Sequence, residues 1–122
     1  MMSYHLKLEN CYIAKNDEYA RHLFFSLADE LGLHGRAIAE HEFYPYGITI
    51  MMVLAESHIS MHTWPERHEI QIDLFHCADA ADDFGLKLVA TVLYLFKPKL
   101  LRGIVVDRQT MVVSSIPPHV GT

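Results

Sequence analysis

Side chains capable of chemistry gather in one short stretch of the chain, residues 56–66. The stretch combines carboxylates, imidazoles and hydroxyls in the order ESHISMHTWPE. Such a set could hold a metal ion through its histidines, or it could supply a nucleophilic serine with a histidine base. Each of these chemistries requires a particular spacing, which can be tested against the sequence.

Metal binding would need the imidazoles of His58 and His62 to meet at one ion. On a helix their spacing would place both on one face, but Ile59, Thr63 and Pro65 favour a strand that ends at the proline. Four residues of strand span about 13 Å, which is too far for one ion with ligand bonds of about 2 Å. We therefore predict that the chain has no metal site.

A hydrolase would use Ser57 or Ser60 as the nucleophile and His62 as the base. In α/β-hydrolases the nucleophilic serine lies in a G-x-S-x-G turn, which exposes its hydroxyl. Neither serine has glycines in that pattern. The sequence therefore does not favour a hydrolase.

The hydrophobic pattern of the whole chain predicts the elements that must position this stretch. Period-2 alternation or β-branched runs predict strands over residues 4–11, 36–43, 48–54, 57–64, 70–75 and 104–107. Apolar residues every four positions predict helices over residues 17–31 and 79–96, and we interpret residues 114–122 as a frayed tail.

This element order predicts an α+β fold, a two-layer sandwich in which two helices cover one face of a mainly antiparallel sheet. The other face of such a sheet must be solvated or covered by a partner. Because residues 48–54 form a continuous apolar run, covering on both faces is favoured. We therefore expect a homodimer.

Length, composition and charge exclude several classes of protein. A chain of 122 residues with 51% hydrophobic residues fits a single domain over residues 1–122 with enough apolar mass for a core. A net charge of −5 argues against nucleic-acid binding.

No apolar run approaches the ~20 residues of a membrane span, and the first residues lack the apolar segment of a secretion signal. With two cysteines, too few for a disulfide scaffold, we expect a reduced, cytoplasmic protein.

Residues 54–66 resemble the processing site of the bacterial and archaeal S-adenosylmethionine decarboxylase proenzymes, whose signature is E-S-H-[IL]-[ST]-[IM]-H-T-[WY]-P-E. The family's F-x-P-x-G turn is matched upstream by residues 43–47, and its D-[VL]-[FY]-x-C strand is matched downstream by residues 73–77. The next residue is Ala78, where the family commonly has glycine. Because all three motifs occur in the right order and spacing, the resemblance is specific, and it extends over nearly the whole chain.

The resemblance implies that the chain cuts its own backbone between Glu56 and Ser57. The products would be a β chain of residues 1–56 and an α chain of residues 57–122. The Ser57 hydroxyl would attack the preceding carbonyl and convert the amide to an ester. Elimination and hydrolysis would then leave a pyruvoyl group in place of the serine.

The resemblance also implies roles for other side chains. His62 would accept a proton during processing, with support from Thr49 at a position that is usually serine. Cys77 would return a proton to the substrate after decarboxylation, because an ordinary thiol is mostly protonated at neutral pH. Phe43 would stack on the adenine, and Glu66 would place a negative charge near the cationic substrate.

The implied cofactor is the pyruvoyl group itself. Its ketone can form a Schiff base with the amino group of the substrate and take up the charge left by decarboxylation, a role otherwise filled by pyridoxal phosphate. The implied substrate is S-adenosylmethionine, the implied product serves spermidine synthesis, and the family's active sites lie at a dimer interface.

Two alternatives remain at this point. Some homologues with the same machinery act on arginine or ornithine, because the processing motif reports how the cofactor is made and not which amino acid enters. A non-catalytic relative could instead bind and regulate a partner. The presence of Ser57, His62 and Cys77 together argues against this second alternative.

Overall fold

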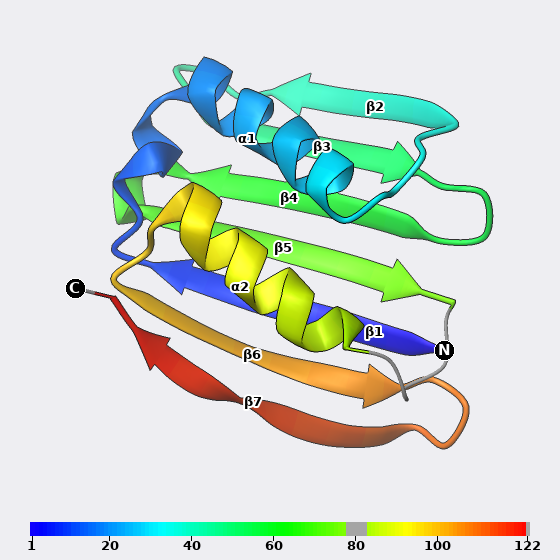
Figure 1. Cartoon of the computed structure of the whole chain (residues 1–122). Coiled ribbons are helices and arrows are strands. Elements are labelled where there is room, and N and C mark those ends of the chain that lie inside the picture. Colours follow the sequence, from blue (N-terminus) through cyan, green and yellow to red (C-terminus); the bar gives the residue numbers. More distant parts are fainter. Residues whose placement is uncertain (78–82, 122) are drawn as a thin grey trace.

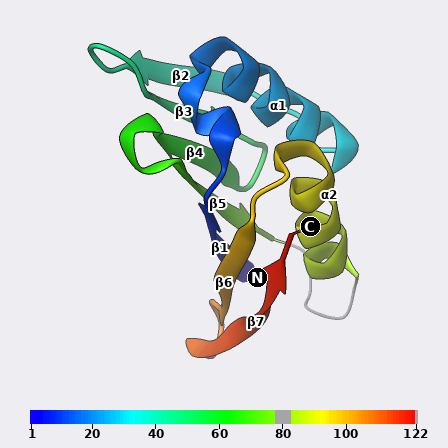
Figure 2. The same cartoon turned by 90° about the vertical axis from the view of Figure 1, so that its left-hand side faces the viewer.

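The computed structural model describes residues 1–77 and 83–121. In this part of the chain, seven strands form one sheet, and two helices, α1 (Asp17–Glu30) and α2 (Phe84–Phe96), lie on one of its faces (Figures 1 and 2). All strand pairings within the described residues are antiparallel. The predicted two-layer α+β sandwich is confirmed.

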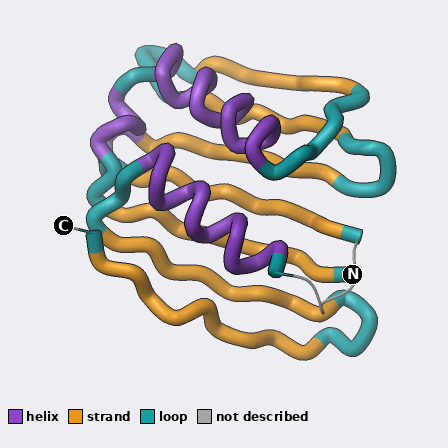
Figure 3. Tube along the Cα trace, viewed as in Figure 1, coloured by secondary structure: helices purple, strands orange, loops and turns teal. Residues whose placement is uncertain are grey.

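The strands follow the order β2-β3-β4-β5-β1-β6-β7 across the sheet, so the N-terminal strand lies between two strands from the second half of the chain (Figure 3). Their bounds are β1 Met2–Glu9, β2 Ala37–Glu42, β3 Ile48–Val53, β4 His58–Trp64, β5 Glu69–His76, β6 Leu100–Asp107 and β7 Val112–Val120. Short 3-10 helices occupy Tyr12–Lys15 and Pro65–Arg67.

The periodicity of the sequence located most of these elements to within a few residues. The predicted helix over residues 79–96 is present from Phe84 onward, while Ala78 and residues 79–82 lie outside the described residues. Helix α1 begins where predicted, and the Asn16 side chain caps it by accepting a hydrogen bond from the Tyr19 backbone N–H at 3.0 Å. None of the helices in the described residues is long and apolar enough to cross a membrane.

The prediction of a frayed tail at the C-terminus is wrong. Strand β7 pairs with β6 on both sides of a register shift between Leu101 and Gly103, and Pro117 and Pro118 lie at that irregularity without a paired residue. Proline has no backbone N–H, but β7 is an edge strand, and on its outer side no described strand needs that donor. The prolines were therefore a poor reason to exclude a strand.

The two faces of the sheet differ in burial. Alternate strand residues pack against the helices and are fully buried, namely Leu8, Ile48, Ile50, Ile59, Met61, Ile70 and Ile72. The residues between them point to the other face, which no element of the described part of the chain covers (Figure 2). We call this the uncovered face. The apolar run over residues 48–54 therefore alternates, with Thr49, Met51 and Val53 on the uncovered face.

Candidate active site

The predicted cleavage point lies in the tight connection between β3 and β4. The Leu54 backbone N–H donates to the Ser57 carbonyl at 2.9 Å, which closes the turn. Glu56 is exposed and Ser57 is half-buried. We call residues 54–57 the scission loop. Because only a short turn connects two paired strands here, the Glu56–Ser57 peptide bond is held at a defined place at one end of the sheet.

Cys77 reaches this peptide bond through the register of the neighbouring strands. His58 pairs with Phe75, so the antiparallel ladder brings the residues just before β4 beside those just after Phe75. The Cys77 thiol accordingly donates to the Glu56 carbonyl oxygen, with an Sγ–O distance of 2.7 Å. That oxygen belongs to the peptide bond predicted to break.

Two hollows border the scission loop. One has a volume of about 270 Å³, and its lining includes Ser57, His76 and Cys77 together with Gly32 and His34. The other, of about 420 Å³, lies between the scission loop, Phe75 and Arg108. The half-buried Ser57 therefore has room around it for a reacting partner.

The remaining predicted site residues line a different cavity, at the opposite end of β3 and β4. This cavity of about 390 Å³ contains Phe43, Thr49, His62 and Glu66. Its aromatic wall is completed by Tyr44, Tyr46 and Trp64. We call it the aromatic pocket. It therefore brings together the predicted substrate-binding residues and the predicted proton acceptor.

Within the aromatic pocket, Thr49 and His62 form a direct pair. They are opposite each other in the β3–β4 ladder, and Thr49 Oγ1 and His62 Nδ1 share a hydrogen bond of 2.8 Å. The His62 ring also stacks on Trp64, with ring centroids 5.7 Å apart. His62 Nε2 makes no hydrogen bond among the described residues. One ring nitrogen is thus fixed, and the other is available to a reacting group.

The structure does not bring Ser57 and His62 of one chain together. Five residue steps along β4 separate them, which corresponds to about 16 Å of strand. The aromatic pocket and the hollows around the scission loop share no lining residue. In Figure 1, the β3–β4 connection and the end of β5 lie at one end of the strands. The β2–β3 and β4–β5 connections lie at the opposite end.

No cluster of three or more His, Cys, Asp or Glu side chains suited to a metal ion occurs within residues 1–77 and 83–121. Cys11 lines neither the aromatic pocket nor the two hollows at the scission loop. It is fully buried, and its thiol donates to the Phe96 carbonyl at 3.2 Å. Burial raises the pKa of the Cys11 thiol to about 11, an effect opposed by a hydrogen bond with the backbone of Ile13.

Sequence reasoning assigned no role to the tyrosines of the aromatic pocket or to Trp64. The signal was present, because Tyr44 and Tyr46 are part of the matched F-x-P-x-G turn. The sequence also did not indicate Asp17 as a site residue, although its carboxylate reaches the backbone of this turn from α1. Nothing in the local sequence around residue 17 indicates that contact.

Comparison with known proteins places this geometry in a family. The family model described as S-adenosylmethionine decarboxylase matches residues 4–109. The chain belongs to this family. It is 35% identical over 103 residues to the S-adenosylmethionine decarboxylase proenzyme of Persephonella marina, covering 84% of this chain and 76% of that protein. It is 36% identical over 97 residues to the proenzyme of Archaeoglobus fulgidus, covering 79% and 83%.

Solved structures agree with this membership. The crystal structure of the adenosylmethionine decarboxylase from Aquifex aeolicus matches with a TM-score of 0.73 and 25% identity, covering 85% of this chain and 86% of that one. The monomer structure of Trypanosoma brucei AdoMetDC has a TM-score of 0.58 at 18% identity and covers 85% of this chain and 45% of that one, which shows a shared fold. These relatives of the S-adenosylmethionine decarboxylase family do not favour the arginine, ornithine or non-catalytic alternatives.

Proposed function

We propose that this chain is a pyruvoyl-dependent S-adenosylmethionine decarboxylase that cleaves itself between Glu56 and Ser57. We propose further that two copies of the chain build each active site together. The observation that carries the proposal is the hydrogen bond of 2.7 Å from the Cys77 thiol to the carbonyl oxygen of the bond to be cut.

Self-cleavage begins with attack of Ser57 Oγ on the carbonyl carbon of Glu56. Negative charge then develops on the Glu56 carbonyl oxygen, where the Cys77 thiol is already in place to stabilise it. Breaking the C–N bond transfers the acyl group from nitrogen to oxygen and gives an ester. Removal of the Ser57 Cα proton breaks the Cβ–Oγ bond, releases Glu56 as a carboxylate and leaves dehydroalanine, which loses ammonia on hydrolysis to give the pyruvoyl group.

These steps need a base that takes the proton from the attacking hydroxyl or from Cα. His62 suits this role, because Thr49 fixes its Nδ1 while Nε2 has no partner among the described residues. The His62 of the same chain lies too far along β4 to serve Ser57. The base must therefore come from a second copy.

A two-fold axis supplies that second copy without any change of fold. The axis would lie between the uncovered faces of the two copies and run perpendicular to their strands. A rotation of 180° about it reverses the strand direction and places the scission loop of one copy over the aromatic pocket of the other. Packed sheets lie about 10 Å apart, so side chains from the two faces meet between them. The half-exposed Met51, Val53 and Ile104 would be buried by this contact.

The aromatic pocket would then bind the nucleoside part of the substrate. Its volume of about 390 Å³ lies in the range of small-molecule sites, and its wall combines the exposed ring of Phe43 with the carboxylate of Glu66. An aromatic face suits both the adenine ring and the sulfonium cation, and a carboxylate adds attraction for the cation.

The residues around Ser57 fit a pyruvoyl group, because two hollows border the scission loop and a thiol lies beside it. When formed, this group supplies the electron sink for the charge left at Cα by loss of carbon dioxide. Cys77 would donate the proton that replaces the carboxyl group. Both cysteines are free, which suits a reducing compartment such as the cytoplasm.

The direct test is the intact mass of the purified protein. We expect two fragments, residues 1–56 and residues 57–122, the second lacking a free amino group at its start. Ser57→Ala should remain a single chain of 14.0 kDa and release no carbon dioxide from S-adenosylmethionine. A processed protein with an ordinary serine at residue 57, or cleavage of Ser57→Ala at the same bond, would refute the proposal.

A further inference from the structure

The loop that carries Phe43 is held by contacts outside the aromatic pocket itself. We call residues 43–47 the aromatic loop; it connects β2 to β3 and is closed by a hydrogen bond of 2.8 Å from the Phe43 N–H to the Gly47 carbonyl. Its aromatic side chains are about half or fully exposed, at 49% for Phe43, 99% for Tyr44 and 52% for Tyr46. The core therefore does not fix the position of this loop.

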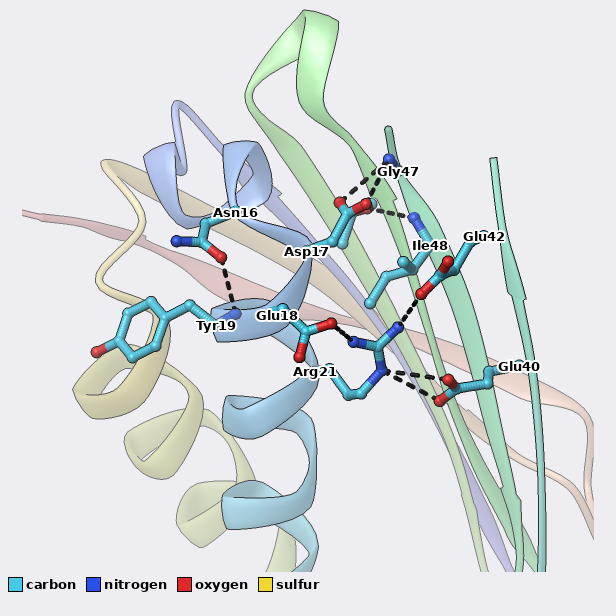
Figure 4. A network of polar contacts seen from close by, with 10 residues as sticks. Asn16, Asp17, Glu18, Tyr19, Arg21, Glu40, Glu42, Gly47 and Ile48 are labelled. Carbon is cyan, nitrogen blue, oxygen red and sulfur yellow. Dashed lines mark hydrogen bonds and ion pairs between the residues drawn. The ribbon is translucent and has the colours of Figure 1, made fainter. Parts of the chain in front are cut away.

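The first turn of α1 does so instead. Both carboxylate oxygens of Asp17 accept a hydrogen bond from the Gly47 backbone N–H, at 3.1 and 3.2 Å (Figure 4). Gly47 is buried and has a φ of +110°, and a Cβ at this position would lie 3.3 Å from the Pro65 side chain. The backbone here is therefore fixed in a conformation that only glycine adopts readily, with its N–H directed at a charged acceptor.

Neighbouring contacts anchor the two ends of the aromatic loop. After the loop, the Ile48 N–H donates to Thr63 Oγ1 at 2.9 Å. Before the loop, Arg21 donates to Glu42 at 2.8 Å, and it also binds Glu40 and Glu18 (Figure 4). Partial burial lowers the pKa of Arg21, but its hydrogen bonds with these carboxylates outweigh that effect and raise the pKa above the ordinary value. Asp17 adds the side-chain contact to the aromatic loop itself, at Gly47.

We infer that Asp17 is a positioning residue for substrate binding, acting through the Gly47 N–H on the aromatic loop and hence on Phe43. The inference rests on the proposed function, in which Phe43 contacts the adenine. Without Asp17 the buried Gly47 N–H would lose its acceptor, and the loop would have to shift to satisfy it. The scission loop and the Thr49–His62 pair do not contact Asp17 in the structure, so self-cleavage should not depend on it.

Steady-state kinetics of the processed enzyme test this role. Asp17→Ala should raise KM for S-adenosylmethionine roughly tenfold, the size expected from a lost hydrogen bond to a charged group, and change kcat by less than about twofold. Asp17→Asn keeps an oxygen acceptor and should restore KM to within about threefold of the parent. Self-cleavage should run at the parental rate in both variants.

A matched control separates positioning from helix stability. Asn16→Ala removes the cap at the start of α1, yet leaves the Asp17–Gly47 contact in place. It should lower thermal stability and leave KM unchanged. Equal KM values for Asp17→Ala and the parent, or an equal rise of KM in Asn16→Ala, would overturn the inference.

Equilibrium binding provides a readout without turnover. 5′-Methylthioadenosine carries the adenosyl part of the substrate without its amino acid, and Trp64 in the aromatic pocket can report binding by fluorescence. Asp17→Ala should raise its Kd roughly tenfold, as Phe43→Ala should. If Phe43→Ala leaves Kd unchanged, the assignment of the aromatic pocket in the proposed function fails; if only Asp17→Ala leaves it unchanged, the positioning role alone fails.

Discussion

Mixing two inactive variants tests whether each active site takes residues from two copies of the chain. Ser57→Ala removes the nucleophile, and His62→Ala removes the proposed base. Ser57 and His62 line separate cavities, and about 16 Å of strand lies between the two residues. Each variant alone should therefore remain uncleaved, since every dimer lacks one of the two groups at both sites.

The fraction cleaved in the mixture follows from how random pairing distributes the two groups. Equal co-expression gives about half of the dimers as heterodimers, and in each of these one site combines an intact Ser57 with an intact His62 from the partner. About one quarter of all chains should therefore be cut, and each cut chain should be the His62→Ala variant. Affinity tags of different mass on the two variants would identify it by denaturing electrophoresis and intact mass.

A second mixture serves as the control that distinguishes shared sites from sites contained in one chain. When the double variant Ser57→Ala/His62→Ala is co-expressed with the parent, shared sites allow cleavage only in parent homodimers, so about one quarter of all chains are cut. If each chain instead served itself, about one half of all chains would be cut here, and none in the first mixture. That result would refute the shared site and the two-fold arrangement together.

Two further predictions concern the cysteines. Cys77→Ala should slow self-cleavage about tenfold, because it removes the donor to the Glu56 carbonyl, and it should abolish most carbon dioxide release. Cys77→Ser should recover self-cleavage more than decarboxylation. Gel time courses measure the first reaction, and carbon dioxide assays measure the second. Because the pKa of Cys11 rises from 9.0 to about 11 on folding, its stabilising contribution is complete below about pH 9 and is lost as pH rises through 11, a loss of about 2–3 kcal/mol in the free energy of unfolding.

Both predictions have clear contrary outcomes. Parental cleavage kinetics in Cys77→Ala would remove the thiol from the processing step. For Cys11, denaturant titrations of the parent and Cys11→Ala at about pH 8 and about pH 11 give two stability differences. If these differences are equal, the buried thiol does not ionise on unfolding as argued.

The sequence predicted the layers of this fold because its periodicities are strong. Period-2 strands and four-residue helical spacing identify which face of each element is buried, and a two-layer sandwich follows from them. Strand β7 was missed because Pro117 and Pro118 are tolerated in a sheet at an edge or a bulge, and both edge position and the register shift against β6 depend on how strands pair. Strand order is a long-range property that local patterns do not contain.

The site was predictable in its residues but not in its arrangement. The matched motifs contain Ser57, His62 and Cys77. The rise of about 3.3 Å per residue along a strand, which argued against a metal site, also places Ser57 and His62 far apart on one strand. The contact between Cys77 and Glu56 could not be foreseen, because it depends on the register of β4 against β5. The same holds for Asp17 and Gly47, which are 30 residues apart in sequence.

The position of β1 has a consequence for the fragments that cleavage would produce. Severing the bond after Glu56 leaves β1, β2 and β3 on one piece and β4 through β7 on the other, yet β1 is inserted between β5 and β6. The two pieces are interlaced across three backbone ladders, β3 with β4, β5 with β1, and β1 with β6. A nick at the hairpin tip can therefore create new chain ends for catalysis while the molecule stays in one piece.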